Sequence, residues 1–301
     1  MNRELFTNNL KERLEELTEC KVILQTNTKN NGVKMESLVI MREGQNAAPT
    51  IYTDIWWEVY NEGESFETIV IKVLEWERKA ILSRRLDLDF FLDFHKVKEN
   101  LRFKIINTEK NIEILNDIPH KDFLDLSKAY YVEIRNEEIG TGTVLITNKH
   151  MQMWGTNLED IDKYATDNTE QRNPYCIFPM EKIAEGLMKE IAGTEEDIPD
   201  FRIPPMEMYV LTNQQRFLGA SVLLCKNVLK DFVKEKEDDL YILPSSTHEL
   251  IVIPARVVWY TGINHLKEIV KEVNSTQVEP EEFLSNNVYR YDRETDKIEI
   301  V

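Results

Sequence analysis

Ser246, His248 and Glu249 are the residues of this sequence whose types and proximity could support nucleophilic catalysis. They lie in the stretch "LYILPSSTHELIVIP", between two apolar runs. A hydrolase of this kind needs a serine nucleophile, a histidine that accepts its proton, and a carboxylate that orients the histidine. Because all three residue types are present, this stretch is the candidate catalytic site.

The spacing within this stretch favours a structural role. In an extended segment only residues i and i+2 share a face, so Ser246 and His248 could meet while Glu249 points away. The sequence also lacks the GxSxG turn that exposes a serine above a helix. Pro244 fixes φ, and serine hydroxyls in a turn bond nearby backbone amides. Alternatively Ser245 or Ser246 caps a single helical turn, with Glu249 completing a capping box. We favour a turn or a cap over a catalytic site.

No metal or nucleotide motif is recognisable. The five histidines are far apart in the sequence, without an HExxH or Cys/His pattern: His95, His120, His150, His248 and His265. The short "GTGT" at residues 140–143 matches neither nucleotide-binding fingerprint and precedes a predicted strand, not a helix. We therefore expect no cofactor and no metal, although a site assembled from distant residues stays open.

The charge balance limits the partners. The chain has 301 residues, with 54 acidic and 37 basic side chains and a formal net charge of −17. This excess of carboxylates opposes binding to nucleic acid and to anionic membrane surfaces. Solubility is the simplest role for such charge, because the acids are scattered along the chain. The sharper alternatives are a basic protein partner and mimicry of nucleic acid, as in proteins of mobile elements.

The expected location is the cytoplasm. The cysteine count is odd, with Cys20, Cys176 and Cys225 and no CxxC pair, which is typical of a reducing compartment. The N-terminal stretch "MNRELFTNNLKERLEEL" has no apolar core of signal-peptide length. No run approaches the roughly 20 apolar residues of a membrane helix.

The elements that would position these residues alternate irregularly. Apolar periodicity predicts helices over residues 4–19, 179–192, 220–237 and 279–285, and strands over "LYIL" and "LIVIP". The turn "TKNNG" predicts a hairpin. Local hairpins recur without strict βαβ alternation, which favours an α+β fold with mixed, mostly antiparallel β-sheets and packed helices. The length favours two lobes, which we place at residues 1–120 and 121–301.

Several stretches together resemble a known family: "APTIYTDIWWEVYNEGES", "NIEILNDIPHKDFLDL", "TNKHMQMWG", "LYILPSSTHELIVIP" and "LSNNVYRYD". They are similar to the clostridial proteins of domain of unknown function 5688, over nearly the whole chain. The most specific piece is Leu243–Glu249. The resemblance implies a cytoplasmic bacterial protein and carries over no activity, cofactor or catalytic residue.

These observations predict a binding or interaction protein without a cofactor. The first alternative is a hydrolase that uses Ser246 and His248, with Glu249 as the orienting acid. The second is an acidic mimic of nucleic acid.

Overall fold

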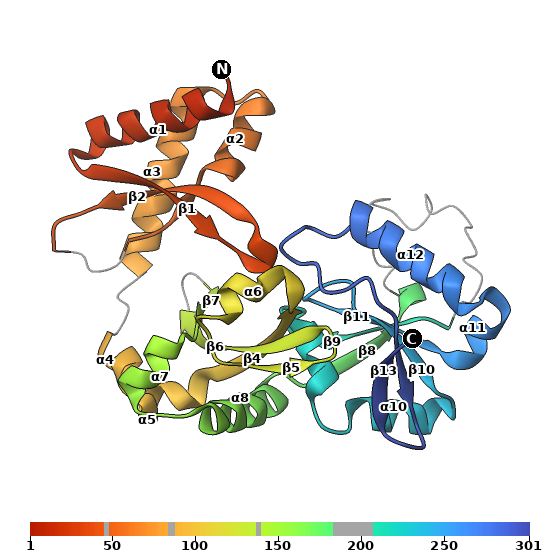
Figure 1. Cartoon of the computed structure of the whole chain (residues 1–301). Coiled ribbons are helices and arrows are strands. Elements are labelled where there is room, and N and C mark those ends of the chain that lie inside the picture. Colours follow the sequence, from red (N-terminus) through yellow and green to blue (C-terminus); the bar gives the residue numbers. More distant parts are fainter. Residues whose placement is uncertain (45–47, 84–87, 137–139, 183–206) are drawn as a thin grey trace. The chain divides into compact units, whose positions relative to one another are not determined.

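The computed structural model describes residues 1–44, 48–83, 88–136, 140–182 and 207–301 (Figure 1). Contacts divide the chain into two compact units, Met1–Phe91 with Ile134–Gly142, and Leu92–Glu133 with Thr143–Val301. The two lobes expected at residues 1–120 and 121–301 stay a prediction. Strands Leu101–Asn107 (β4) and Leu126–Asn136 (β6) pair and hold residues on both sides of position 120 together.

The fold is α+β, as the sequence predicts. The first unit contains helices α1 (Arg3–Thr18), α2 (Thr53–Asn61) and α3 (Phe66–Ser83), the turn η1 (Asn30–Gly32), and strands β1 (Lys21–Thr28), β2 (Lys34–Met41) and β3 (Ile51–Tyr52). Helix α4 (Leu88–Leu92) ends at the border between the units.

The sheet of the first unit has the order β1-β2-β3, and each neighbouring pair is antiparallel. The expected hairpin at "TKNNG" is present, with Asn31 at φ 61° and Gly32 at φ 70° closing the turn between β1 and β2. Leu5 and Leu17 of the leucine stripe that the periodicity predicts are exposed, whereas helix α1 buries Leu10 and Leu14. These side chains share a core with Val22 of β1 and residues of α3.

The second unit is larger. Its helices are α5 (Phe94–Val97), α6 (Ile112–Leu115), α7 (Asn148–Trp154), α8 (Leu158–Arg172), α10 (Val228–Lys236), α11 (Ala255–Thr261) and α12 (Ile263–Thr276), with shorter turns η2 (Lys98–Asn100), η3 (Glu109–Asn111) and η5 (Gly219–Leu224). Its strands are β4, β5 (His120–Phe123), β8 (Tyr175–Pro179), β9 (Tyr209–Asn213), β10 (Leu240–Leu243), β11 (Leu250–Pro254), β12 (Tyr289–Asp292) and β13 (Lys297–Ile300), with most of β6 and part of β7 (Gly140–Leu145). The end of β6 and the start of β7 belong to the first unit.

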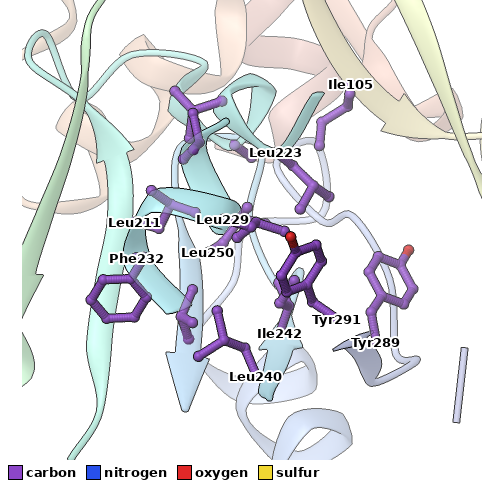
Figure 2. Packing of buried hydrophobic residues seen from close by; sticks show 14 of the residues in the cluster. Ile105, Leu211, Leu223, Leu229, Phe232, Leu240, Ile242, Leu250, Tyr289 and Tyr291 are labelled. Carbon is purple, nitrogen blue, oxygen red and sulfur yellow. The ribbon is translucent and has the colours of Figure 1, made fainter. Parts of the chain in front are cut away.

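Two sheets organise this unit. One has the order β13-β12-β10-β11-β9-β8, and the other has the order β4-β6-β5 with β7 also paired to β6. The first sheet and α10 enclose the largest apolar core. Figure 2 shows Leu229 and Phe232 of α10 beside the strand residues Leu211, Ile242 and Leu250.

Several expected elements differ from the structure. The helix expected over residues 220–237 is divided into η5 and α10, because Asn227 between them adopts a left-handed φ of 63°. Residues 279–285 form a turn and a short bridge instead of a helix. Pro179 ends the edge strand β8, where a missing N–H is tolerated. Residues 183–192 of the helix expected there lie outside the described residues.

Across the described ranges, no helix combines the length and the apolar composition needed to cross a bilayer.

Candidate functional site

The candidate catalytic stretch forms the connection of a hairpin between two buried strands. Strands β10 and β11 pair antiparallel from Leu240 opposite Pro254 to Leu243 opposite Ile251. Residues 244–249 join them without a helical turn. Of the two structural roles that the sequence allows here, the turn is confirmed, and the capped helical turn is not formed.

The hydroxyl of Ser246 is used within this connection. Its Oγ accepts the backbone N–H of His248 at 3.0 Å. Ser246 also forms a β-bridge to Phe283, and the neighbouring Thr247 donates its N–H to the carbonyl of Glu282 at 2.8 Å. The serine therefore bonds a backbone amide in its own turn, as its position after a proline predicts.

Backbone bonds hold the rest of the connection on two sides. The carbonyls of Pro244 and Ser245 accept the N–H groups of Ser285 and Leu284 at 2.9 and 3.0 Å. On the other side, Thr212 donates its hydroxyl to the carbonyl of His248 at 2.7 Å. The connection is thus fixed between the end of β9 and the segment that precedes β12.

Both ring nitrogens of His248 have partners. Nδ1 accepts the backbone N–H of Leu218 at 3.1 Å, which requires a lone pair on that nitrogen. Nε2 lies 3.2 Å from Oε1 of Glu282 and can donate to it. The arrangement fits a neutral imidazole with its proton on Nε2. Phe217 lies against the ring, with 5.7 Å between centroids.

The structure therefore brings together part of the predicted triad. Ser246 contacts the backbone of His248, and the carboxylate beside the imidazole is Glu282, not Glu249. Sequence reasoning missed Glu282 because it lies far along the chain, in a segment expected to be a helix. No local signal connects the two positions.

Gly219 is a second residue that the sequence did not single out. A Cβ atom at this position would lie 2.5 Å from the carbonyl oxygen of His248 and 2.8 Å from the backbone nitrogen of Asn213, and would also strike Oγ1 of Thr212. Only glycine permits this approach between η5, β9 and the connection.

A polar cluster around Asp125 explains part of the "LSNNVYRYD" stretch. The Asp125 carboxylate accepts the hydroxyl of Ser285 at 2.5 Å, the amide of Asn287 at 2.9 Å, and the phenol of Tyr289. Burial and the adjacent carboxylate raise the pKa of Tyr289, so the phenol stays protonated and donates. The cluster anchors the entry to β12.

The exposed apolar residues of α11 and α12 form a different kind of candidate. Trp259 of α11 is 90% exposed, and Ile269 and Val273 of α12 are each 39% exposed. Leu266 and Val270 of the same helix are buried. We use the name α11–α12 patch for these three exposed residues of two consecutive helices, Trp259, Ile269 and Val273. Tryptophan, with tyrosine and arginine, is enriched among residues that dominate protein interfaces.

A metal site and a reactive Cys225 thiol find little support in the described ranges. They contain no group of three or more His, Cys, Asp or Glu side chains arranged to hold a metal ion. Burial raises the pKa of the Cys225 thiol to about 12, so this cysteine is not a reactive nucleophile.

The model of a family described as "Family of unknown function (DUF5688)" matches residues 3–293, and the chain belongs to this family. No curated protein and no solved structure matches it.

Proposed function

We propose that this member of the DUF5688 family acts in the cytoplasm by binding a protein partner through the α11–α12 patch, without a cofactor. The observation that carries the proposal is the exposure of Trp259. A partner that covers this indole, which is 90% exposed, removes a large apolar surface from water, and this burial is favourable. Trp259 therefore supports a role as the anchor of an interface.

The net charge favours a basic partner. At −17, the chain attracts positively charged proteins over distances set by the ionic strength. Complementary charge accelerates the encounter of the two proteins, while the desolvated aromatic anchor supplies most of the affinity. Binding of this kind weakens as salt is added.

Affinity capture with matched variants tests the proposal. Extract from the cells that naturally contain the protein is passed over immobilised wild type, Trp259→Ala and Trp76→Ala. Trp76 is the control, because it is also exposed, at 40%, but lies on α3 in the other unit. We expect recovery of a basic protein by wild type and Trp76→Ala, and a loss of at least about tenfold with Trp259→Ala. Equal recovery by all three proteins would contradict the proposal.

A hydrolase that uses Ser246 and His248 is the second candidate. The observation in its favour is the carboxylate of Glu282 at 3.2 Å from the imidazole, which resembles the histidine–acid half of a triad. The nitrogen left to act as base would be Nδ1, and that atom accepts the N–H of Leu218. Catalysis would require His248 to release this bond, which makes hydrolysis the weaker proposal.

The variant Ser246→Ala separates the two candidates. In a binding protein it leaves the capture of the partner unchanged and lowers the free energy of unfolding by about 1 kcal/mol, because the hydroxyl that accepts the His248 N–H is lost. In a hydrolase it abolishes turnover of ester and peptide substrates by the wild type. Ser245→Ala serves as the control in both assays.

A further inference from the structure

Strand β1 leaves one side of its backbone open. It is the edge strand of the β1-β2-β3 sheet, and its only strand partner in the described chain is β2. The N–H of Lys29 donates to the carbonyl of Val33 at 2.7 Å, so these two residues form a hydrogen-bonded pair at the end of the hairpin. Such pairs alternate along an antiparallel ladder. The odd-numbered residues of β1 therefore bond β2, and the even-numbered residues direct their N–H and C=O groups outward.

The backbone hydrogen bond of Val22 agrees with this alternation of bonded and outward residues. Its N–H donates to the Glu15 carboxylate of α1 at 2.9 Å, which closes the first outward position. The next outward positions are Leu24, Thr26 and Thr28, whose residues are exposed. Within the described part of the chain, their outward backbone groups have no partner. The open edge therefore runs from Leu24 to Thr28.

Several other strand edges in the described residues carry features that discourage pairing. Proteins protect edges with short strands, charged side chains and proline. Strand β3 has two residues, β13 carries Lys297 and Glu299, β5 carries Lys121 and Asp122, and β8 ends in Pro179. By contrast, β1 has eight residues and no charge between Lys21 and Lys29. Between these two lysines the strand has none of these protective features.

We propose that β1 pairs antiparallel with β1 of a second copy of this chain, which joins the two three-stranded sheets across a two-fold axis. Placing Thr26 opposite Thr26 brings Leu24 opposite Thr28, so the outward positions of both strands coincide as hydrogen-bonded pairs. No charged residue opposes another within this run. Threonine pairs across strands are favourable, and a two-fold interface uses the same patch on both copies.

The predicted association is weak and strengthened by salt. One strand edge is small compared with a stable protein interface, so the dimer forms at high protein concentration. Two chains of −17 repel one another, and added salt screens that repulsion. This salt dependence is opposite to that of the complex with a basic partner, so the failure of one proposal is distinguishable from the failure of the other.

Sedimentation equilibrium with three variants tests the pairing. Thr26→Lys places like charges opposite each other at the two-fold axis, and Thr26→Pro removes an outward N–H while sparing the ladder to β2. Thr26→Val keeps the N–H and is the matched control. We expect the dissociation constant of the dimer to rise at least about tenfold for the lysine and proline variants and to stay near the wild-type value for valine. Circular dichroism checks that each variant is folded.

Two results would overturn the proposal. One is a wild type that stays monomeric at millimolar concentration in about 0.5 M salt. The other is a dimer whose dissociation constant is the same for wild type and Thr26→Lys.

Discussion

His248 shows how a residue suited to catalysis can serve to join segments. Its backbone N–H bonds Ser246, its carbonyl accepts from Thr212, and its ring bonds Leu218 and Glu282. The bond to Ser246 lies within the loop between β10 and β11, and the other three bonds tie this loop to neighbouring segments. The residue types match those of a hydrolase, but their hydrogen bonds are directed mainly at backbone groups.

Gly219→Ala is expected to destabilise the second unit strongly. The added Cβ would lie within 3 Å of backbone atoms of His248 and Asn213, which cannot move without breaking β9 or the β10–β11 connection. We expect a loss of at least about 3 kcal/mol in the free energy of unfolding, measured by urea denaturation. Gly142→Ala is the control, because its Cβ would meet only Ile134 O at 3.9 Å. A loss for Gly219→Ala no larger than that of the control would contradict the close approach.

The lowered pKa of Asp162 predicts a loss of stability in acid. Burial by itself raises its pKa, but hydrogen bonds from Lys121 at 2.7 Å and Lys128 at 2.6 Å outweigh this effect and lower the pKa from 3.8 to about 2. A carboxyl whose pKa is lower in the folded state contributes stability above its unfolded pKa, and that contribution disappears as the pH falls through the folded value.

The contribution of Asp162 is about 2 kcal/mol, present above about pH 4 and lost between about pH 4 and 2. Urea denaturation at several pH values measures it. In Asp162→Asn the free energy of unfolding should fall less steeply over this range than in wild type. Parallel curves for the two proteins would show that the lysine bonds do not lower the pKa of Asp162.

At the scale of elements, a buried ion pair joins the chain after β2 to α3. Glu77 of α3 is 1% exposed, and its two oxygens accept from Arg42 at 3.1 and 3.0 Å. Arg42→Ala leaves a buried carboxylate without its partner, which should cost about 3 kcal/mol or more. Replacing both residues by methionine should cost less than this single change, because no charge stays buried. Thermal and urea denaturation of the variants measure the difference, and a double variant less stable than Arg42→Ala would contradict it.

Element prediction succeeded where the local signal is strong. The helix over residues 4–19 and the "TKNNG" hairpin appear as expected. The Asn157 side chain caps α8 by accepting the Asp160 N–H at 2.9 Å. The pattern over residues 220–237 was misleading. Its apolar spacing is helical throughout, yet Asn227 takes a left-handed conformation and ends one element before the next begins.

At the scale of the whole molecule, the two units have separate apolar cores. Leu10 is buried in the core of the first unit and Leu211 in the largest core of the second. We expect scanning calorimetry to resolve two transitions, since separate cores can unfold independently. Leu10→Ala should lower the temperature of one transition and Leu211→Ala that of the other. A single transition that both variants shift equally would show that the units unfold together.

The sequence by itself determined the fold class, the local hairpins, and the turn role of Ser246, because each depends on spacing within a few residues. Only the tertiary structure decided which acid lies beside His248, why Gly219 must be glycine, and that Trp259 is exposed. These three features depend on contacts between segments distant in the chain, and local periodicity contains no information about which distant segments meet. Whether His248 can act as a base depends on the hydrogen bonds of its ring, and only the folded chain specifies these.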